Sequence, residues 1–343
     1  MTICCLLCHA NTKNFDTYVK ELPFKNKHII AQGVVRSTMY YRENKVDILT
    51  VNKTYNKKLT VEPKLANTNL KGLRSIEQFH NKEKDSLGIV NSTYFNLETG
   101  LPIGLLKIND EILTGSVYNR SALVIEGNTY TIERIGMNIH INNTQIDNIN
   151  QSRMSKYHTI LYNSRWGRIA PPIPENGVEV VVDNNLVKKI STNREEIPNT
   201  GYVVVGPKQK LLNFNVGDNV ILDVDTIPSF KNAQHIVSGG PTVLKNREIH
   251  ITSKEEKVGG IGEGRYNRTG VCYTEDNTLI IFIVHGKGIT LQDEAILMKT
   301  FNCIDGLNLD GGGSTSGYIQ NENLVNPSAR WLSNVLVVRE ANE

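Results

Sequence analysis

Residues 308–317 read NLDGGGSTSG, in which three adjacent glycines lie between Asp310 and a run of hydroxyl side chains. Glycines let the backbone adopt left-handed angles or approach a ligand closely. Consecutive N–H groups with the hydroxyls of Ser314 and Thr315 can bind an anion. An acid beside a bare phosphate site is unfavourable, so Asp310 indicates a catalytic group or an acceptor for sugar hydroxyls. A plain tight turn is the structural alternative.

Other stretches carry groups that could join such a site. RYNRTG contains Arg265 and Arg268, whose guanidinium forks suit phosphate. His285, in VHGKG, could titrate near neutral pH. Taken singly, these residues are as well explained by a surface ion pair and a packed histidine. A phosphate-binding P-loop of a nucleotide-dependent phosphotransferase is disfavoured, because Gly311, Gly312 and Gly313 are not followed by a Gly-Lys-Ser/Thr ending or by a helix.

Two further stretches pair glycine or polar residues with turns. VNSTYFNLETGLPIG places Asn91 and Tyr94 at the end of an expected strand, before a Pro-x-Gly turn. VSGGPTVLKNREI places Gly239 and Gly240 before another strand. A core aromatic followed by a turn, and a lead-in to a hairpin, are the simpler explanations of each stretch on its own.

Strands must hold most of these residues. Short β-branched runs with polar turns predict hairpins at 122–135 and 178–190. Continuous apolar runs predict buried strands at 278–286 and 334–338. The glycine loop itself lies between a strand-like run, IDGLNL, and a hairpin-like run, YIQNENLV. A flexible linker is therefore disfavoured at residues 308–317.

Helical patterns are few. Thr290 and Asp293 form a capping pattern before the helical run 290–302, and a weaker pattern covers 75–85. Segregated strands with a few helices indicate an α+β fold with strand-rich, mixed or antiparallel curved sheets. The Pro-rich stretch 168–177 is an expected loop or seam, but too short to separate domains. We therefore predict a single main domain.

Composition limits the function classes. The chain has 343 residues, 39% of them hydrophobic, and a net charge of +3. So small a charge does not favour a nucleic-acid partner, and no apolar run reaches the ~20 residues of a membrane helix. No cysteine spacing resembles a zinc site. Cys272 and Cys303 could pair in an oxidising compartment, but spacing does not decide this.

The N-terminus allows two interpretations. MTICCLLCHA, with three of the five cysteines, resembles the tail of a secretory signal peptide that lacks its charged start. A native, partly buried segment is equally consistent with it. We divide the chain into a signal-peptide remnant at 1–10, an N-terminal extension at 11–29 and the main domain at 30–340. A signal remnant would place the protein in the cell envelope, in the periplasm or outside the cell.

Taken together and in this order, the stretches resemble the phosphodiester glycosidase family. The family's Asp-Gly-Gly-Gly-Ser-Thr loop and its following Asn-x-Pro, Arg and Asn series are matched by Asp310 to Thr315, Asn326, Pro327, Arg330 and Asn334. NSTYF with LPIG, the Gly239-Gly240-Pro241 strand and NRTG are similar to three upstream elements. The resemblance covers roughly residues 30 to 340 and is strongest over the last eighty or so.

Three sequence elements depart from the family pattern. Ser92 and Thr93 replace glycines, which puts close approach of a sugar to that backbone in doubt. His285 and Lys287 stand where the family often has Asp-Gly-Arg, which would alter the preference for the leaving group. Gly270 replaces the usual alanine after Arg-Thr, which we take to be a minor change.

The resemblance implies hydrolysis of a sugar-1-phosphodiester, such as one of N-acetylglucosamine or of an envelope or exopolysaccharide, to a free sugar and a phosphomonoester. Because Asp310 lies at the glycine loop, we predict catalysis by Asp310, Arg268 and Asn91, with Asp310 orienting the sugar or activating water and Arg268 holding the phosphate. The predicted substrate-binding residues are Gly311, Gly312, Gly313, Ser314, Thr315, Thr269, Gly239, Gly240, Tyr94, His285, Arg330 and Asn334.

Two questions stay open at this point. No cofactor is certain, and an oxygen-ligated divalent cation is compatible with the many Asp and Asn residues, although no EF-hand spacing is present. The alternative function is a non-catalytic polysaccharide-binding envelope protein on the same fold, which the changed NSTYF element motivates. The substrate is expected to be a sugar phosphodiester, polymeric or not, and the oligomeric state is undetermined.

Overall fold

A computed structural model describes residues 14–260, 264–324 and 329–341. The first ten residues, and Asn326 with Pro327, therefore lie outside the described residues. Strands dominate, most of them antiparallel, as the sequence predicts. None of the helices in the described part of the chain has the length and apolarity needed to cross a membrane.

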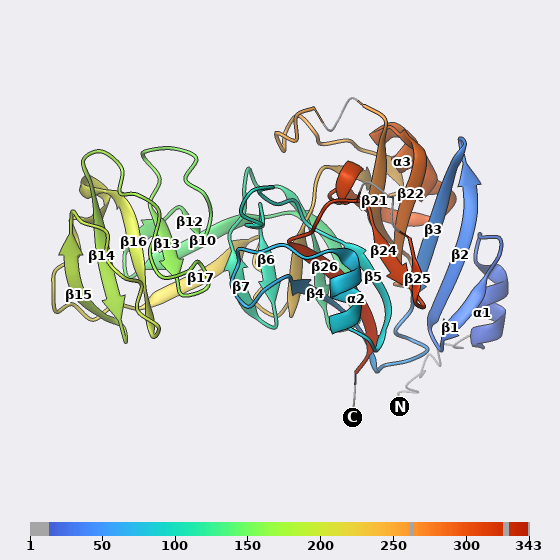
Figure 1. The fold of residues 1–343 in the computed structure, drawn as a ribbon, viewed down its shortest axis with the longest axis horizontal. Coiled ribbons are helices and arrows are strands. Elements are labelled where there is room, and N and C mark those ends of the chain that lie inside the picture. The colour runs from blue at the N-terminus through green and yellow to red at the C-terminus, as the bar shows by residue number, and fades with distance from the viewer. Residues whose placement is uncertain (1–13, 261–263, 325–328, 342–343) are drawn as a thin grey trace, which may run out of the picture.

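An eight-stranded sheet forms the centre of the body (Figure 1). Its order is β1 (His28–Ala31), β2 (Val34–Tyr41), β3 (Asn44–Val51), β22 (Leu279–Ile289), β21 (Tyr266–Thr274), β23 (Cys303–Asn308), β19 (Thr242–Lys245) and β20 (Glu248–Ile249). Every pairing in it is antiparallel. Strands from both ends of the sequence are thus neighbours at its centre.

A second sheet packs on one face of the central sheet. Its order is β25 (Glu322–Asn323), β24 (Gly317–Ile319), β5 (Ser86–Asn91), β26 (Asn334–Glu340) and β4 (Leu59–Leu65). Leu49 and Ile283 of the central sheet share one buried cluster with Val90 and Leu336 of the second sheet. The two sheets therefore form a sandwich whose interior is apolar.

Two helices cover the outer faces of this sandwich. Helix α3 (Leu291–Thr300) buries Ala295 and Met298 on the central sheet, and helix α2 (Ile76–Lys82) buries Phe79 on the second sheet. Both begin with a capping box, with Thr290 and Ser75 as the N-cap residues. Both helices predicted from the sequence are confirmed, and each is shorter than its predicted range.

The predicted N-terminal extension packs on this body. Helix α1 (Phe15–Glu21) buries Tyr18, whose hydroxyl is 3.0 Å from that of Thr278, and Phe24 joins the cluster beneath α3. Strand β1 crosses the predicted boundary between residues 29 and 30. The extension is thus part of the same packed unit in this structure.

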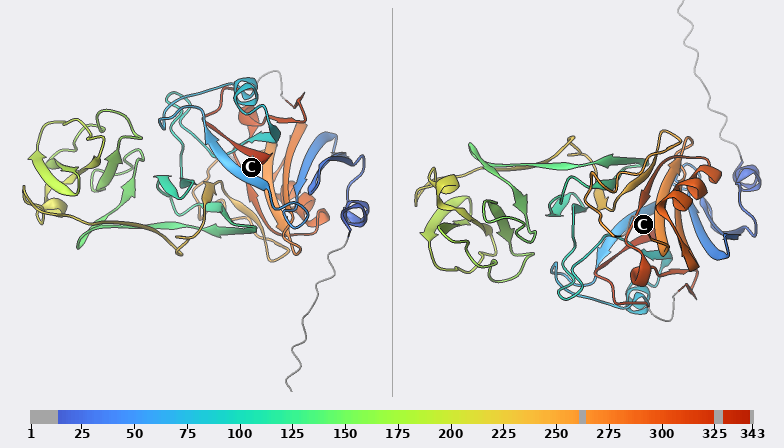
Figure 2. Two further views of the ribbon diagram at one scale, coloured as in Figure 1. Left: turned by 90° about the horizontal axis from the view of Figure 1, so that it is seen from below. Right: turned by 90° about the horizontal axis from the view of Figure 1, so that it is seen from above.

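A third sheet adjoins the sandwich, and a separate lobe stands away from it (Figure 2). The third sheet has the order β7 (Glu111–Thr114), β6 (Leu106–Ile108), β18 (His235–Ser238), β8 (Ser121–Glu126) and β9 (Thr129–Arg134). Strands β10 (Gly136–Ile141) and β17 (Leu222–Ile227), with β11 (Thr144–Ile146), lead to the lobe. The lobe's sheet has the order β12 (Asn148–Ile149), β13 (Ile160–Asn163), β16 (Gly201–Pro207), β14 (Gly177–Asp183) and β15 (Leu186–Ser191), with a 3₁₀ turn, η1 (Lys208–Leu211).

The lobe has its own apolar cluster, which includes Val180, Val204 and Phe214. On its other side Tyr162 and Trp166 join the cluster of the body, and Arg165 pairs with Glu111 of β7. The predicted loop at 168–177 connects β13 to β14 inside this lobe. The single main domain stays a prediction, since the lobe has a core of its own yet also shares the central one.

Candidate active site

The ends of several strands meet at one end of the sandwich. β5 ends at Asn91, β23 ends at Asn308, β26 begins at Asn334, and Arg268 and Thr269 lie near the start of β21. The glycine loop connects β23 to β24 there, as the sequence predicts, and contains a 3₁₀ turn, η2 (Gly312–Ser314). Residues far apart in the sequence are thereby brought together around Asp310.

The three glycines of the loop differ in backbone angle and in the atoms that a side chain would meet. Gly312 has a φ of +61°, which favours glycine. A Cβ on Gly311 would lie 2.8 Å from the carbonyl oxygen of Asn267, and one on Gly313 would lie 2.7 Å from Nη2 of Arg330. The Arg330 N–H also donates to the Gly313 carbonyl at 2.9 Å. The glycines thus let the loop pass between β21 and the segment that carries Arg330.

The Asp310 carboxyl titrates near neutral pH. Burial raises its pKa to about 6, while the Ser314 hydroxyl, the Arg330 guanidinium and the Gly311 N–H, which donates to Oδ1 at 2.9 Å, favour the ionised form. Ser314 does not reach full hydrogen-bonding geometry with it. A carboxyl in this range can exchange a proton with water or substrate at physiological pH.

Buried polar atoms without a hydrogen-bond partner gather around this loop. Among the described residues they are Ser92 Oγ, Thr93 Oγ1, Ser314 Oγ, Thr315 Oγ1, Ser333 Oγ and Asn334 Nδ2. All six side chains are at most 1% exposed. Buried polar groups are nearly always satisfied in native proteins, so hydroxyl-rich ligands or water would complete these bonds.

The Asn91 side chain holds the glycine loop in place through hydrogen bonds. Its Oδ1 accepts hydrogen bonds from the Thr269 hydroxyl at 2.6 Å and the Ser316 N–H at 3.1 Å, and its Nδ2 donates to the Asp310 carbonyl at 2.6 Å. Asn334 acts similarly, since its Oδ1 accepts the Thr93 N–H at 2.9 Å. Both amides therefore fix the backbone around Asp310.

Arg268 is fully buried, unlike a typical exposed phosphate ligand. Its guanidinium donates to the carbonyls of Ile289 and Gly264, both at 3.2 Å, and to Asn308 Oδ1 at 3.4 Å. Glu294 of α3 lies on the same side of the sheet, where burial raises its pKa to about 8 and Arg268 lowers it. Arg268 thus places positive charge beneath the site.

Tyr94, Asn308 and Gly240 form a second buried network. The Tyr94 hydroxyl donates to the Gly240 carbonyl and accepts from Asn308 Nδ2, both at 2.8 Å. The N–H groups of Gly239 and Gly240 donate to Ser121 and Asn308. These two glycines therefore use their N–H groups within the protein and position Asn308, a residue that the sequence prediction omitted although it belongs to the same NLDGGG stretch.

Arg330 and His285 differ in their relation to Asp310. The exposed guanidinium of Arg330 lies over Gly313 and acts electrostatically on Asp310. His285 lies on β22, opposite Lys45 of β3 and on the side of β21 away from β23. Burial lowers its pKa. The structure thus brings Arg330 to Asp310, while His285 lies two strands from β23.

The described residues include few candidate ligands for a metal ion near the site. The described part of the chain contains no group of three or more His, Cys, Asp or Glu side chains placed to hold a metal ion. The donors around Asp310 are mainly hydroxyls and amides, which suit the hydroxyl groups of a sugar.

Comparison with known proteins relates part of the chain to one family. Residues 176–339 match the model of the phosphodiester glycosidase family, which confirms the resemblance read from the sequence. No curated protein matches the chain.

Solved structures share the fold at low sequence identity. A hypothetical protein from Synechocystis superposes with a TM-score of 0.80 at 19% identity, over 89% of this chain and 61% of its own. A predicted exported protein of Burkholderia pseudomallei K96243 gives 0.71 at 16% identity, over 86% of this chain and 74% of its own. This chain thus spans less than two thirds of the Synechocystis protein.

A third structure is the catalytic domain of zebrafish N-acetylglucosamine-1-phosphodiester alpha-N-acetylglucosaminidase, auto-inhibited by its pro-peptide. It gives a TM-score of 0.48 at 16% identity, over 92% of this chain and 85% of its own. That score is too low to carry an argument about this fold.

Proposed function

We propose that this chain, whose residues 176–339 match the phosphodiester glycosidase family, hydrolyses the glycosidic bond of a sugar-1-phosphodiester. Water adds to the anomeric carbon, the bond from that carbon to the phosphate oxygen breaks, and the phosphomonoester leaves with the bonding electrons. The proton of the attacking water passes to a base. The products are a free sugar and a phosphomonoester.

The observation that carries this proposal is the titratable carboxyl of Asp310 among buried, unpartnered hydroxyls and beside an exposed arginine. We assign Asp310 as the base toward water, or as the group that orients the sugar. An oxocarbenium-like transition state is stabilised by nearby negative charge. A phosphomonoester has a second pKa of about 6 and leaves readily, so little help from a general acid is required.

The remaining residues fall into those proposed to contact the substrate and those that position other groups. We assign the phosphate to the exposed guanidinium of Arg330, and sugar hydroxyls to Ser314, Thr315 and Asn334. Asn91, Thr269 and Asn308 are positioning residues, because their side chains hold the backbone or other side chains. Arg268 supports the site through its charge from below. His285 is proposed to influence the leaving group only indirectly.

The sugar and its compartment are part of the same proposal. N-acetylglucosamine is the first sugar to test, because the zebrafish enzyme carries it in its name. Action outside the cytoplasm, in the envelope or as a secreted protein, is supported by the disulfide between Cys272 and Cys303, which forms in oxidising compartments.

The test is release of free sugar from a panel of methyl phosphodiesters of sugar 1-phosphates. We expect Asp310→Asn to lower kcat by about 10²–10⁴-fold. Full turnover by this variant would remove Asp310 from the chemistry. Binding of the panel by the wild type without any release of sugar would favour the alternative, a polysaccharide-binding protein on the same fold.

Thermal stability serves as the control that the Asp310→Asn protein is folded. The native pKa of Asp310, about 6, lies above its ordinary value of 3.8. The native state therefore loses stability as pH rises from about 4 through 6. Asn cannot ionise, so Asp310→Asn should unfold at the same or a higher temperature than wild type at pH 8, which circular dichroism can measure.

A further inference from the structure

Two loops next to the site contain strained residues. Tyr118 and Asn119 in loop 116–120, and Lys257 in loop 252–258, have φ values of +56°, +49° and +50°. This conformation is uncommon for residues other than glycine, and for a bulky tyrosine it is an outlier. Strain of this kind persists where surrounding contacts enforce it and is concentrated at ligand-binding sites.

Hydrogen bonds lock the two loops together. Arg120 donates from Nε to the Glu256 carbonyl at 3.2 Å and from Nη2 to the Lys257 carbonyl at 3.3 Å. The Glu256 carboxylate accepts from the Ser121 N–H at 2.9 Å and from its hydroxyl at 2.6 Å. The Lys257 ammonium lies 4.6 Å from the centre of the Tyr118 ring. Tyr118 and Lys257 are thus displayed on a fixed rim.

This rim adjoins the candidate active site. The Arg120 guanidinium lies 5.6 Å from the centre of the Tyr94 ring, and the Tyr94 hydroxyl accepts from Asn308. Both Arg120 and Asp310 act electrostatically on Tyr94. A Cβ on Gly240 would lie 2.4 Å from the Glu256 carboxylate. The Tyr94 side chain therefore lies between Arg120 of the rim and Asn308 of the network next to Asp310.

The rim offers positive charge and an aromatic surface to solvent. Tyr118 is 41% exposed, Lys257 is exposed, and no ion pair joins Lys257 to another residue in the part of the chain that the structure describes. Two acids lie nearby. The buried Glu256 carboxylate accepts hydrogen bonds from Ser121, and the negative charge of exposed Glu255 is balanced by the positive charge of neighbouring Lys254. The rim thus adds the cations Arg120 and Lys257 to Arg330, which acts electrostatically on Asp310.

We propose that the loops 116–120 and 252–258 form a subsite for an anionic polysaccharide, so that the substrate is a polymer of phosphodiester-linked sugars that extends beyond the bond cleaved at Asp310. This rests on the proposed function. Lys257 and Arg120 attract the phosphate groups of the following repeats, and Tyr118 provides an apolar surface for a sugar ring. The unpartnered hydroxyls around Asp310 favour a sugar polymer over a nucleic acid.

The test compares two substrates of one sugar, a polymer of N-acetylglucosamine-1-phosphate repeats and the methyl phosphodiester of N-acetylglucosamine 1-phosphate. The variant is Lys257→Asn, because asparagine tolerates the left-handed conformation. We compare kcat/KM for the polymer with kcat/KM for the methyl phosphodiester. Loss of one charge contact to the polymer should lower the ratio of the first to the second by about threefold to tenfold. Lys257→Arg should retain most of the ratio.

A matched control is Arg247→Asn, which removes a cation with φ of +67° from the far end of β19, where Arg247 pairs with Glu275. It should leave the ratio unchanged. An equal effect of Lys257→Asn on both substrates, or no effect on either, would overturn the polymer subsite.

Binding separates this proposal from the proposed function. The polymer, labelled with a fluorophore, is titrated with full-length Asp310→Asn protein and with the same protein carrying Lys257→Asn, and anisotropy is measured. Weaker binding in the double variant supports the subsite even if the wild type cleaves neither substrate, a result that would refute only the hydrolysis. A single-stranded oligonucleotide of equal charge that binds as tightly as the polymer would overturn the choice of polymer.

Discussion

Asp310 is subject to two opposing effects. Burial favours its neutral form, while Arg330, Ser314 and the Gly311 N–H favour the carboxylate. The result is a pKa of about 6, close to the pH at which a base must act. Because Arg330 is exposed and the Gly311 N–H is backbone, the guanidinium is the component most easily removed by mutation.

Arg330→Gln should raise the pKa of Asp310, because it removes the positive charge that favours the carboxylate. If Asp310 is the base, kcat/KM increases with pH through its pKa, and this limb should move to higher pH by up to about one unit. Activity at pH 6 should fall more than activity at pH 8. The measurement is a pH profile of kcat/KM on the methyl phosphodiester.

Arg330→Lys is the matched control, since it keeps a positive charge and should keep most of the limb's position. An unmoved limb in Arg330→Gln would mean that another group titrates there. Activity that decreases with rising pH through 6 would instead make Asp310 a proton donor.

At the residue scale, the sequence indicated which residues belong to the site, but not which of them are buried. Asp310, the glycines and Arg330 could be grouped because their motifs occur in a recognisable order. The burial of Arg268 and the bracing contacts of Asn91 could not, since they depend on how β21, β23 and β5 meet. An arginine in the sequence does not show whether its guanidinium faces solvent or donates to a buried carbonyl.

At the element scale, Gly270 of β21 fits the close contact between the central sheet and α3. A Cβ there would lie 2.4 Å from Cζ of Phe282 and 2.6 Å from Oε1 of Glu294. The glycine at position 270 is thus coupled to the packing of a buried acid. Strand and helix approach more closely here than an alanine allows.

Gly270→Ala should therefore destabilise the protein by about 1–3 kcal/mol through overpacking. Urea denaturation measures the change. Adding Glu294→Ala should recover part of the loss by making room, whereas Glu294→Gln, of nearly equal size, should not. Gly259→Ala, where a Cβ would have no neighbour within 4 Å, should change stability by less than about 0.5 kcal/mol. A Gly270→Ala protein as stable as this control would contradict the packing argument.

The elements themselves were largely predictable because their signals are local. The hairpins at 122–135 and 178–190 appear as β8 with β9 and β14 with β15, and Thr290 caps α3. Sheet order was not predictable, since β3 pairs with β22 across more than two hundred residues and no turn encodes that register. The lobe was missed for the same reason, because its strands look like those of the body.

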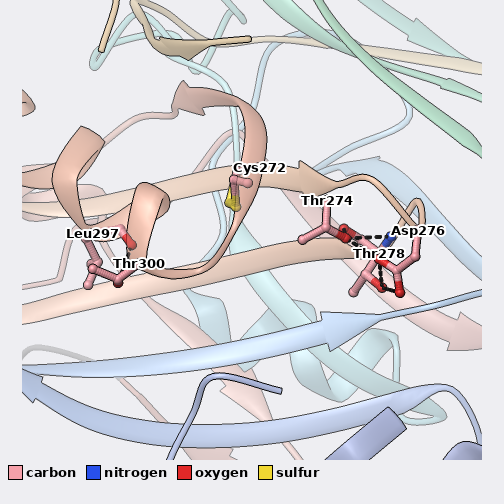
Figure 3. Close-up of a disulfide and its surroundings, with 7 residues drawn as sticks. Cys272, Thr274, Asp276, Thr278, Leu297 and Thr300 are labelled. Atoms are coloured by element: carbon pink, nitrogen blue, oxygen red, sulfur yellow. Dashed lines mark hydrogen bonds between the residues drawn. A yellow bond between two sulfur atoms is a disulfide. The ribbon is translucent and has the colours of Figure 1, made fainter. Parts of the chain in front are cut away.

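At the scale of the whole molecule, one covalent link joins two strands of the central sheet. Cys272 of β21 and Cys303 of β23 form a disulfide beside α3, near Leu297 and Thr300 (Figure 3). Both cysteines are buried, and 31 residues separate them. The pairing that spacing left open is thus present in the structure, on the strands that carry Arg268 and Asn308.

Reduction of this disulfide should lower the free energy of unfolding by about 3–4 kcal/mol, since it removes a constraint on a loop of this length in the unfolded chain. The measurement is urea denaturation with and without a phosphine reductant, with thiol labelling to verify reduction of Cys272 and Cys303. A Cys272→Ala, Cys303→Ala protein should show no further response to reductant. Unchanged stability after verified reduction would contradict the prediction.

The long-range pairings also determine when the site can exist during synthesis. The lobe's sheet and its apolar cluster lie within residues 139–220, so the lobe can fold once that stretch is made. The body pairs β4 with β26, which ends at Glu340, and such distant contacts form slowly. Since chains are made from the N-terminus, Asp310 acquires its surroundings only after β26 has been made, and a nascent chain that stops before β26 would display a folded lobe without a site.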